Sequence, residues 1–111
     1  MAGNQMRLDT RVMFCRPSEG ERTETGGSKE GWNEEFPAWA AARYLRGGEA
    51  VMASRMQGRR PAILILRKRS VLGAIRLDWI VKFGGQSYQV RELPKRREDG
   101  ATVEMLVEAK I

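Results

Sequence analysis

The residues best suited to bind another molecule are six cations around an otherwise apolar segment. They are Arg55, Arg59, Arg60, Arg67, Lys68 and Arg69. The guanidinium fork of arginine matches phosphate oxygens, and a cluster of such cations binds nucleic-acid backbone without recognising bases. A second cluster, Lys95-Arg96-Arg97, follows later in the chain. Both clusters are equally compatible with solvated strand ends that bind nothing.

Residues for catalysis are scarce. The chain has no histidine, and Cys15 is its one cysteine, so a nucleophile lacks its usual base and a zinc site lacks ligands. The acid pairs Glu34-Glu35 and Glu98-Asp99 are adjacent in sequence, so in an extended chain the two side chains of each pair point to opposite faces. The glycine pairs lack the spacing of a phosphate-binding loop. We therefore expect no catalytic residue, no metal ion, no cofactor and no enzymatic activity.

The positive charge is concentrated in the second half of the chain. Residues 1–45 hold six Lys/Arg and seven Asp/Glu, whereas residues 46–111 hold fourteen and seven. Such a half typically meets a polyanion or an acidic protein surface, although it also fits a merely solubilising charge. The 111 residues predict one domain, 1–111, and no apolar run reaches the roughly 20 residues of a membrane span.

The first part of the chain predicts two strands and a short helix. Residues 8–16 alternate between apolar and polar side chains and place Cys15 on the polar face, where a neighbouring subunit could bury it. A polar loop fills residues 18–31. In residues 35–44 the run Ala40-Ala41-Ala42 favours a helix, but Pro37 and a period of two favour a strand. Gly47-Gly48 then breaks the chain before a helix of about two turns, residues 49–56.

The second part predicts further strands. Ala62–Leu66 is apolar on both faces, as in a central covered strand. Residues 79–83 and 87–91 flank Gly84-Gly85-Gln86 and predict a hairpin, because adjacent glycines accept the positive φ of tight turns. Within residues 94–100, Glu98-Asp99-Gly100 predicts a turn, and a last strand follows over residues 103–108.

These elements predict a mainly β fold: a small antiparallel β-barrel or sandwich of five or six strands, with one short α-helix and long loops. Its three tryptophans are expected to pack in the core or at an interface rather than to stack on a ligand. They are Trp32, Trp39 and Trp79.

Six loose motifs occur in a characteristic order between about Leu8 and Glu108. They are Leu8-Asp9-Thr10-Arg11-Val12, Thr25-Gly26-Gly27, Pro37-Ala38-Trp39-Ala40-Ala41, Gly47-Gly48-Glu49-Ala50-Val51-Met52-Ala53, Ile63-Leu64-Ile65-Leu66-Arg67 and Gly85-Gln86-Ser87-Tyr88-Gln89-Val90. This order resembles the phage head–tail joining proteins, also called head-closure or stopper proteins.

The resemblance implies a virion protein of β-barrel fold that forms a closed homo-oligomeric ring around the DNA channel, in the neck between head and tail. Its implied partners are other copies of itself, portal or adaptor ring proteins, tail terminator or tail tube proteins, and double-stranded DNA, with no membrane. Assembly would take place in the bacterial cytoplasm. Fifteen arginines against five lysines suggest a GC-rich host, so a phage, a prophage or a gene transfer agent remains open. Adaptor, stopper and tail-terminator positions also remain open.

The same resemblance directs attention to two flexible segments. Residues 23–31 and 47–58 are expected to contact adjacent rings or line the lumen, through Thr23, Thr25, Gly26, Gly27, Gly47 and Gly48. The basic clusters would face DNA or acidic partner surfaces. The alternative from another class is a small basic β-barrel that binds nucleic-acid backbone non-specifically in the cytoplasm, and a carboxylate enzyme is a distant third.

Overall fold

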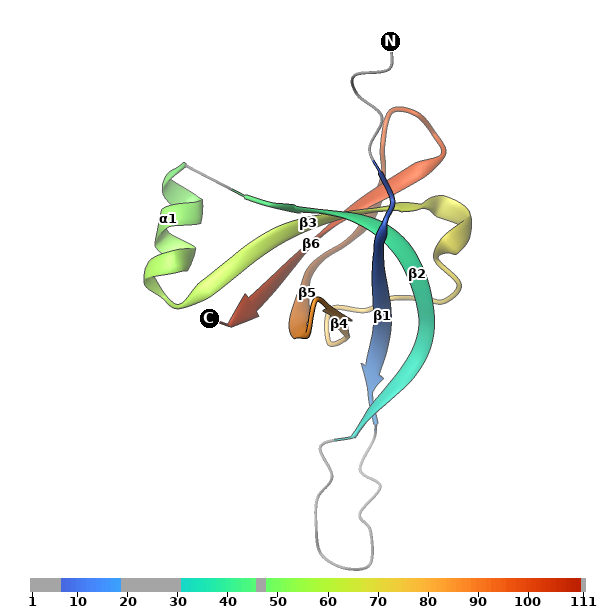
Figure 1. Cartoon of the computed structure of the whole chain (residues 1–111), viewed down its shortest axis with the longest axis horizontal. Helices are drawn as coiled ribbons and strands as arrows, with labels where there is room; N and C mark the ends of the chain where they lie inside the picture. The colour runs from blue at the N-terminus through green and yellow to red at the C-terminus, as the bar shows by residue number, and fades with distance from the viewer. Residues whose placement is uncertain (1–6, 19–30, 46–47, 111) are drawn as a thin grey trace, which may run out of the picture.

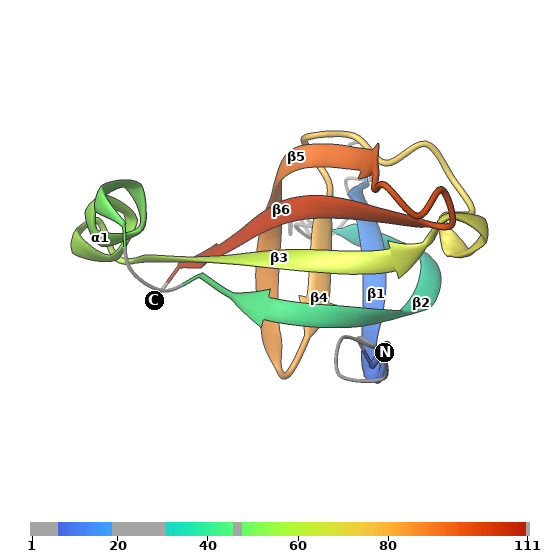
Figure 2. The same cartoon turned by 90° about the horizontal axis from the view of Figure 1, so that it is seen from above.

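Six antiparallel strands close into a barrel in the part of the chain that the computed structural model describes, residues 7–18, 31–45 and 48–110. The elements in chain order are β1 (Thr10–Pro17), β2 (Trp32–Tyr44), α1 (Glu49–Met56), β3 (Arg59–Arg67), the 3-10 turn η2 (Lys68–Ser70), β4 (Ile80–Phe83), β5 (Gln86–Arg96) and β6 (Thr102–Lys110). Around the barrel the order is β1-β2-β3-β6-β5-β4, and α1 lies outside it, beside the start of β3 (Figures 1 and 2). The predicted antiparallel β fold is confirmed, as a barrel rather than a sandwich.

The barrel interior is filled by alternate residues of each strand. Inward-facing side chains on β3 include Leu64 and Leu66, which are fully buried. Phe14 stacks on Phe36 with ring centroids 4.9 Å apart. The core comprises Val12, Phe14, Phe36, Ala38, Ala40, Ala62, Leu64, Leu66, Ile75, Trp79, Val81, Phe83, Tyr88, Val90, Val103, Met105, Val107 and Ala109. Small alanines on β2 leave room for these larger side chains from the opposite wall.

The outer face of β3 is also covered, as its apolar sequence predicted. β3 pairs with β2 on one side and β6 on the other. Ile65 points away from the barrel interior by alternation, yet only 2% of it is exposed, and Ile63 is half-buried. The strand interpretation of residues 35–44 is confirmed too, since β2 runs without a break through the three alanines.

The predicted hairpin between β4 and β5 is confirmed. Phe83 pairs with Gln86, so the loop has two residues. Gly84 and Gly85 have φ angles of 59° and 75°, and positive φ at both positions is typical of a type I′ turn. The predicted turn at Glu98-Asp99-Gly100 is confirmed, and β5 continues to Arg96 just before it. The register of β5 against β6 shifts twice, on either side of Glu92. These shifts accommodate Pro94, which has no N–H to donate to the neighbouring strand.

Cys15 keeps its expected face, but its own chain covers it and not a neighbouring subunit. The register of β1 against β2 shifts between Phe14 and Cys15, so Cys15 lies opposite Glu34 instead of Glu35. The extra residue is on β2, so β1 keeps its alternation and Cys15 lies outside the core cluster that includes Phe14. Cys15 is completely buried by its own chain, and burial raises the pKa of its thiol. A buried thiol with a raised pKa is a poor nucleophile.

Candidate assembly surfaces

The basic residues predicted as a binding set lie at the two ends of β3. Arg59 and Arg60 begin the strand and Arg67 ends it, about 26 Å away at 3.3 Å per residue. Lys68 and Arg69 continue into η2. A single small ligand therefore cannot contact both groups.

The cations at the start of β3 are engaged within the protein. Arg59 Nη1 lies 3.4 Å from Glu108 Oε1 on β6. The Arg60 guanidinium lies over the Tyr44 ring, 5.5 Å from its centroid. Tyr44 in turn shares a hydrogen bond with Tyr88, hydroxyl to hydroxyl, at 2.9 Å. These contacts close this end of the barrel, so its two arginines have structural partners already.

The cations at the end of β3 join the turn between β5 and β6. Arg67 pairs with Thr102, and the backbone N–H of Lys68 donates to the Ala101 carbonyl at 2.8 Å. This juxtaposition forms an open cavity of about 1120 Å³, which we call the basic pocket. It is lined by Leu8, Ile65, Arg67, Lys68, Arg69, Arg97, Asp99, Gly100, Ala101 and Thr102. The pocket thus brings one residue of the later cluster, Arg97, to the earlier one.

The carboxylate in the basic pocket is held by its own turn. The Thr102 hydroxyl donates to Asp99 Oδ2 at 2.7 Å, and the backbone N–H groups of Ala101 and Thr102 donate to Oδ1 at 2.9 Å each. The hydrogen bonds from Thr102, followed by that from Ala101, lower the pKa of Asp99. Arg97 is partly engaged as well, 3.4 Å from Glu104. The exposed Arg67, Lys68 and Arg69 form no ion pair with the described part of the chain.

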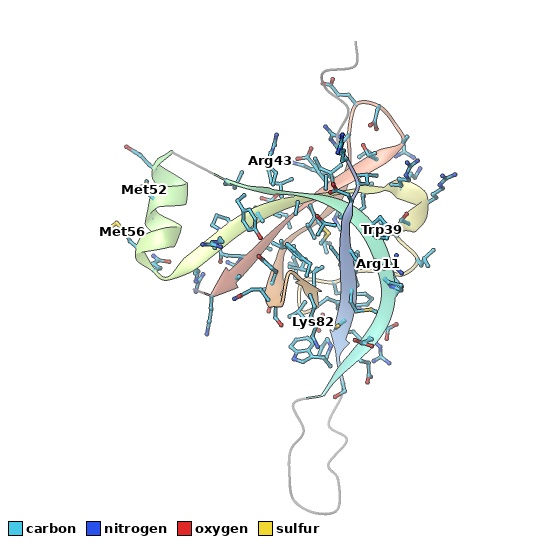
Figure 3. The ribbon with its side chains drawn as sticks, viewed as in Figure 1. Arg11, Trp39, Arg43, Met52, Met56 and Lys82 are labelled. Carbon is cyan, nitrogen blue, oxygen red and sulfur yellow. The ribbon has the colours of Figure 1, made fainter. Side chains whose placement is uncertain are left out.

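An exposed aromatic residue marks the outer surface of β1 and β2. Trp39 is 51% exposed, and its cross-strand partner Arg11 lies over the ring, 5.0 Å from the centroid (Figure 3). Pro37, Met13 and Lys82 continue the same face in a cross-strand row. We call these five residues the tryptophan face. Partly exposed Trp and Arg are the residue types that most often dominate the energy of protein–protein interfaces.

A second apolar surface lies on α1. Met52 is 53% exposed and Met56 is 85% exposed, and residues four apart share one face of a helix. We call this pair the methionine ridge; it points away from the barrel in Figure 3. Gly48 and Gly58, with φ of 83° and 73°, lie just before and just after the helix. α1 contacts β3 and leaves the ridge open.

Several predicted site residues lie where the structure gives no description. Thr23, Thr25, Gly26, Gly27 and Gly47 fall outside the described residues, as does the side chain of Arg55. Within residues 7–18, 31–45 and 48–110, no group of His, Cys, Asp or Glu is arranged to hold a metal ion. No helix in the same residues is long and apolar enough to cross a membrane.

Comparison with known proteins decides the family. Residues 4–110 match the phage head completion proteins. The chain belongs to the phage head completion protein family. It is therefore a structural virion protein of the head–tail region and not an enzyme. No curated protein sequence matches the chain.

Two solved structures share the fold of this head completion protein. One is a chain from the virion of a native gene transfer agent particle, with a TM-score of 0.62, 16% identity, and 96% of this chain and 98% of that chain covered. The other is the solution structure of a protein from Shigella flexneri 2a, with a TM-score of 0.65, 18% identity, and coverage of 98% and 96%.

Sequence reasoning expected Trp39 in the core or at an interface without identifying its neighbours on the tryptophan face, and it overlooked the methionine ridge. The alternation in residues 35–44 already placed Trp39 opposite the buried Phe36, so the exposed position was available as a signal. The sequence indicated the methionine ridge less clearly, because Met52 and Met56 have the spacing of core residues and only the packing of α1 shows that they are exposed.

Proposed function

We propose that this head completion protein is a stopper, or head-closure, subunit, with residues 1–111 forming one connector domain. Copies form a closed ring in the virion neck, link the portal or adaptor ring to the tail terminator or tail tube, and help to retain packaged DNA. Family membership over residues 4–110 supports a place in the head–tail region.

One observation carries the ring: two exposed apolar surfaces lie on opposite sides of one barrel. The methionine ridge projects on the α1 side, whereas Trp39 and Arg11 lie across the barrel from it (Figure 3). Two different surfaces that cover each other between copies make a head-to-tail contact, and such contacts close into rings. Each surface also contains residues that water solvates poorly, so covering them favours assembly.

The experiment is complementation of particles that lack the protein. Wild-type chain should restore tailed particles, whereas its absence should leave heads that lack tails or leak DNA. The double variant Met52→Ser/Met56→Ser and the single variant Trp39→Ala should each fail to restore tails. A matched control, Leu72→Ser/Leu77→Ser, changes two exposed leucines outside both surfaces and should complement normally.

Two outcomes would contradict the proposal. Tailed, DNA-filled particles without the protein would remove its role in the neck. Tight, strongly salt-dependent binding of the isolated chain to DNA, with complementation indifferent to Trp39→Ala and to the methionine variant, would favour a free nucleic-acid-binding barrel instead.

The predicted loop contacts remain part of the proposal. Residues 23–31, with Gly47 and Gly48, would contact adjacent rings or line the lumen. Replacing residues 23–31 by a short Gly-Ser linker should block assembly and leave the melting temperature of the isolated chain nearly unchanged. Normal assembly with the linker would exclude this role.

A further inference from the structure

We infer that the basic pocket is a docking site for an acidic peptide segment of a neck partner, with one apolar side chain of that segment seated on the pocket floor. The identity of the partner as a neck protein rests on the proposed function. The existence of the pocket and the class of ligand that it fits do not depend on the proposed function.

The rim of the pocket supplies unpaired positive charge. Arg67, Lys68 and Arg69 are exposed and lack ion pairs within the described chain. Asp99 forms no ion pair with these three cations; its oxygens accept three hydrogen bonds from Ala101 and Thr102, and Oδ2 lies 4.0 Å from Arg97 Nη1. A carboxylate-rich segment therefore meets available cations rather than existing salt bridges.

The floor of the pocket distinguishes between anionic partners. Leu8 and Ala101 contribute the apolar surface of the lining, which we call the floor, whereas Ile65 is 2% exposed and adds almost none. DNA backbone presents phosphates and sugars and has no protruding apolar side chain to seat on such a floor. A free inorganic anion would leave most of the 1120 Å³ unfilled. A peptide can satisfy both parts at once, with carboxylates at the rim and an apolar side chain on the floor.

The test uses the full-length isolated chain and two fluorescein-labelled peptides. In the first peptide one leucine is flanked by aspartates, and in the second that leucine is replaced by serine. A short DNA duplex is the third probe. Fluorescence anisotropy gives the affinity of each probe at low and at physiological ionic strength, because the charge contribution is screened by salt.

Three variants locate the binding. Lys68→Glu/Arg69→Glu should weaken binding of the leucine peptide by about tenfold or more. Arg43→Glu/Arg76→Glu makes the same change in net charge at two exposed residues outside the pocket lining and should weaken it by less than about threefold. Leu8→Ser should weaken the leucine peptide by about threefold to tenfold and leave the serine peptide unchanged.

Each contrary result overturns the inference. Absence of saturation up to about 1 mM leucine peptide means that the pocket binds no such segment. Equal losses for the pocket and control charge variants mean non-specific attraction. Stronger binding of the duplex, unaffected by Leu8→Ser, means that the pocket faces phosphate backbone. Complementation by the Trp39 and methionine variants is measured separately, so failure of the pocket and failure of the ring are distinguishable.

Discussion

Replacing Tyr88 with phenylalanine should change how the stability of the protein depends on alkaline pH. Tyr88 is 3% exposed, its ring stacks on Phe83 with centroids 4.0 Å apart, and its hydroxyl shares a hydrogen bond with Tyr44. Burial, together with that hydrogen bond, raises the pKa of Tyr88 to about 12. The folded protein therefore disfavours the tyrosinate form.

The sign and size of the effect follow from linkage. The unfolded chain ionises this tyrosine near pH 10, and the folded chain only near pH 12. The contribution of Tyr88 to stability is thus complete below pH 10 and is lost as pH rises from 10 toward 12, by about 1 kcal/mol at pH 11. Tyr88→Phe removes this loss. It also removes a hydrogen bond that contributes about 1 kcal/mol at neutral pH.

The wild-type chain should therefore be more stable than Tyr88→Phe by about 1 kcal/mol at pH 8, and the difference should vanish or reverse at pH 11. Urea unfolding followed by tryptophan fluorescence measures both differences. Val103→Ala is the control: it removes buried apolar contacts at the other end of β5 from Tyr88, so its deficit should not depend on pH over this range. Parallel pH profiles for the wild type and Tyr88→Phe would refute the reasoning.

Two further predictions concern the turns. Because the pKa of Asp99 is lowered, the hydrogen bonds that it accepts from the Ala101 and Thr102 amides should persist through the usual carboxyl pH range and be lost only below it. NMR chemical shifts of these two amides on acidification should report the loss, and unchanged shifts would contradict it. Gly84→Ala places a residue with a Cβ at a backbone φ of 59°, and the added Cβ meets no other atom. Backbone strain alone should therefore lower the free energy of unfolding by about 1–2 kcal/mol, as measured by thermal unfolding, and a neutral result would argue against the type I′ turn.

Much of the fold was predictable because its determinants are local. Alternating side chains specified the strands, and the Gly84-Gly85 pair specified the β4–β5 hairpin through its tolerance of positive φ. Gly58 correctly placed the end of α1. The strand choice for residues 35–44 depended on period and on Pro37, and β2 follows both. The absence of histidine and the lone Cys15 also directed attention away from catalysis without any structure.

The candidate surfaces depended on tertiary structure, because each joins residues distant in sequence. The basic pocket requires β3 to pair with β6, which brings Lys68 against Ala101 and adds Arg97 to the rim. The same pairing places Glu108 beside Arg59 and so occupies a cation that the sequence offered for binding. Cys15 lies outside the core cluster, as its alternation predicted, and is buried because other segments of the chain cover it. Composition and period thus determined that the chain is a basic, non-catalytic β protein, whereas barrel closure and register decided which charges remain free, since cross-strand partners follow from long-range pairing and not from local preference.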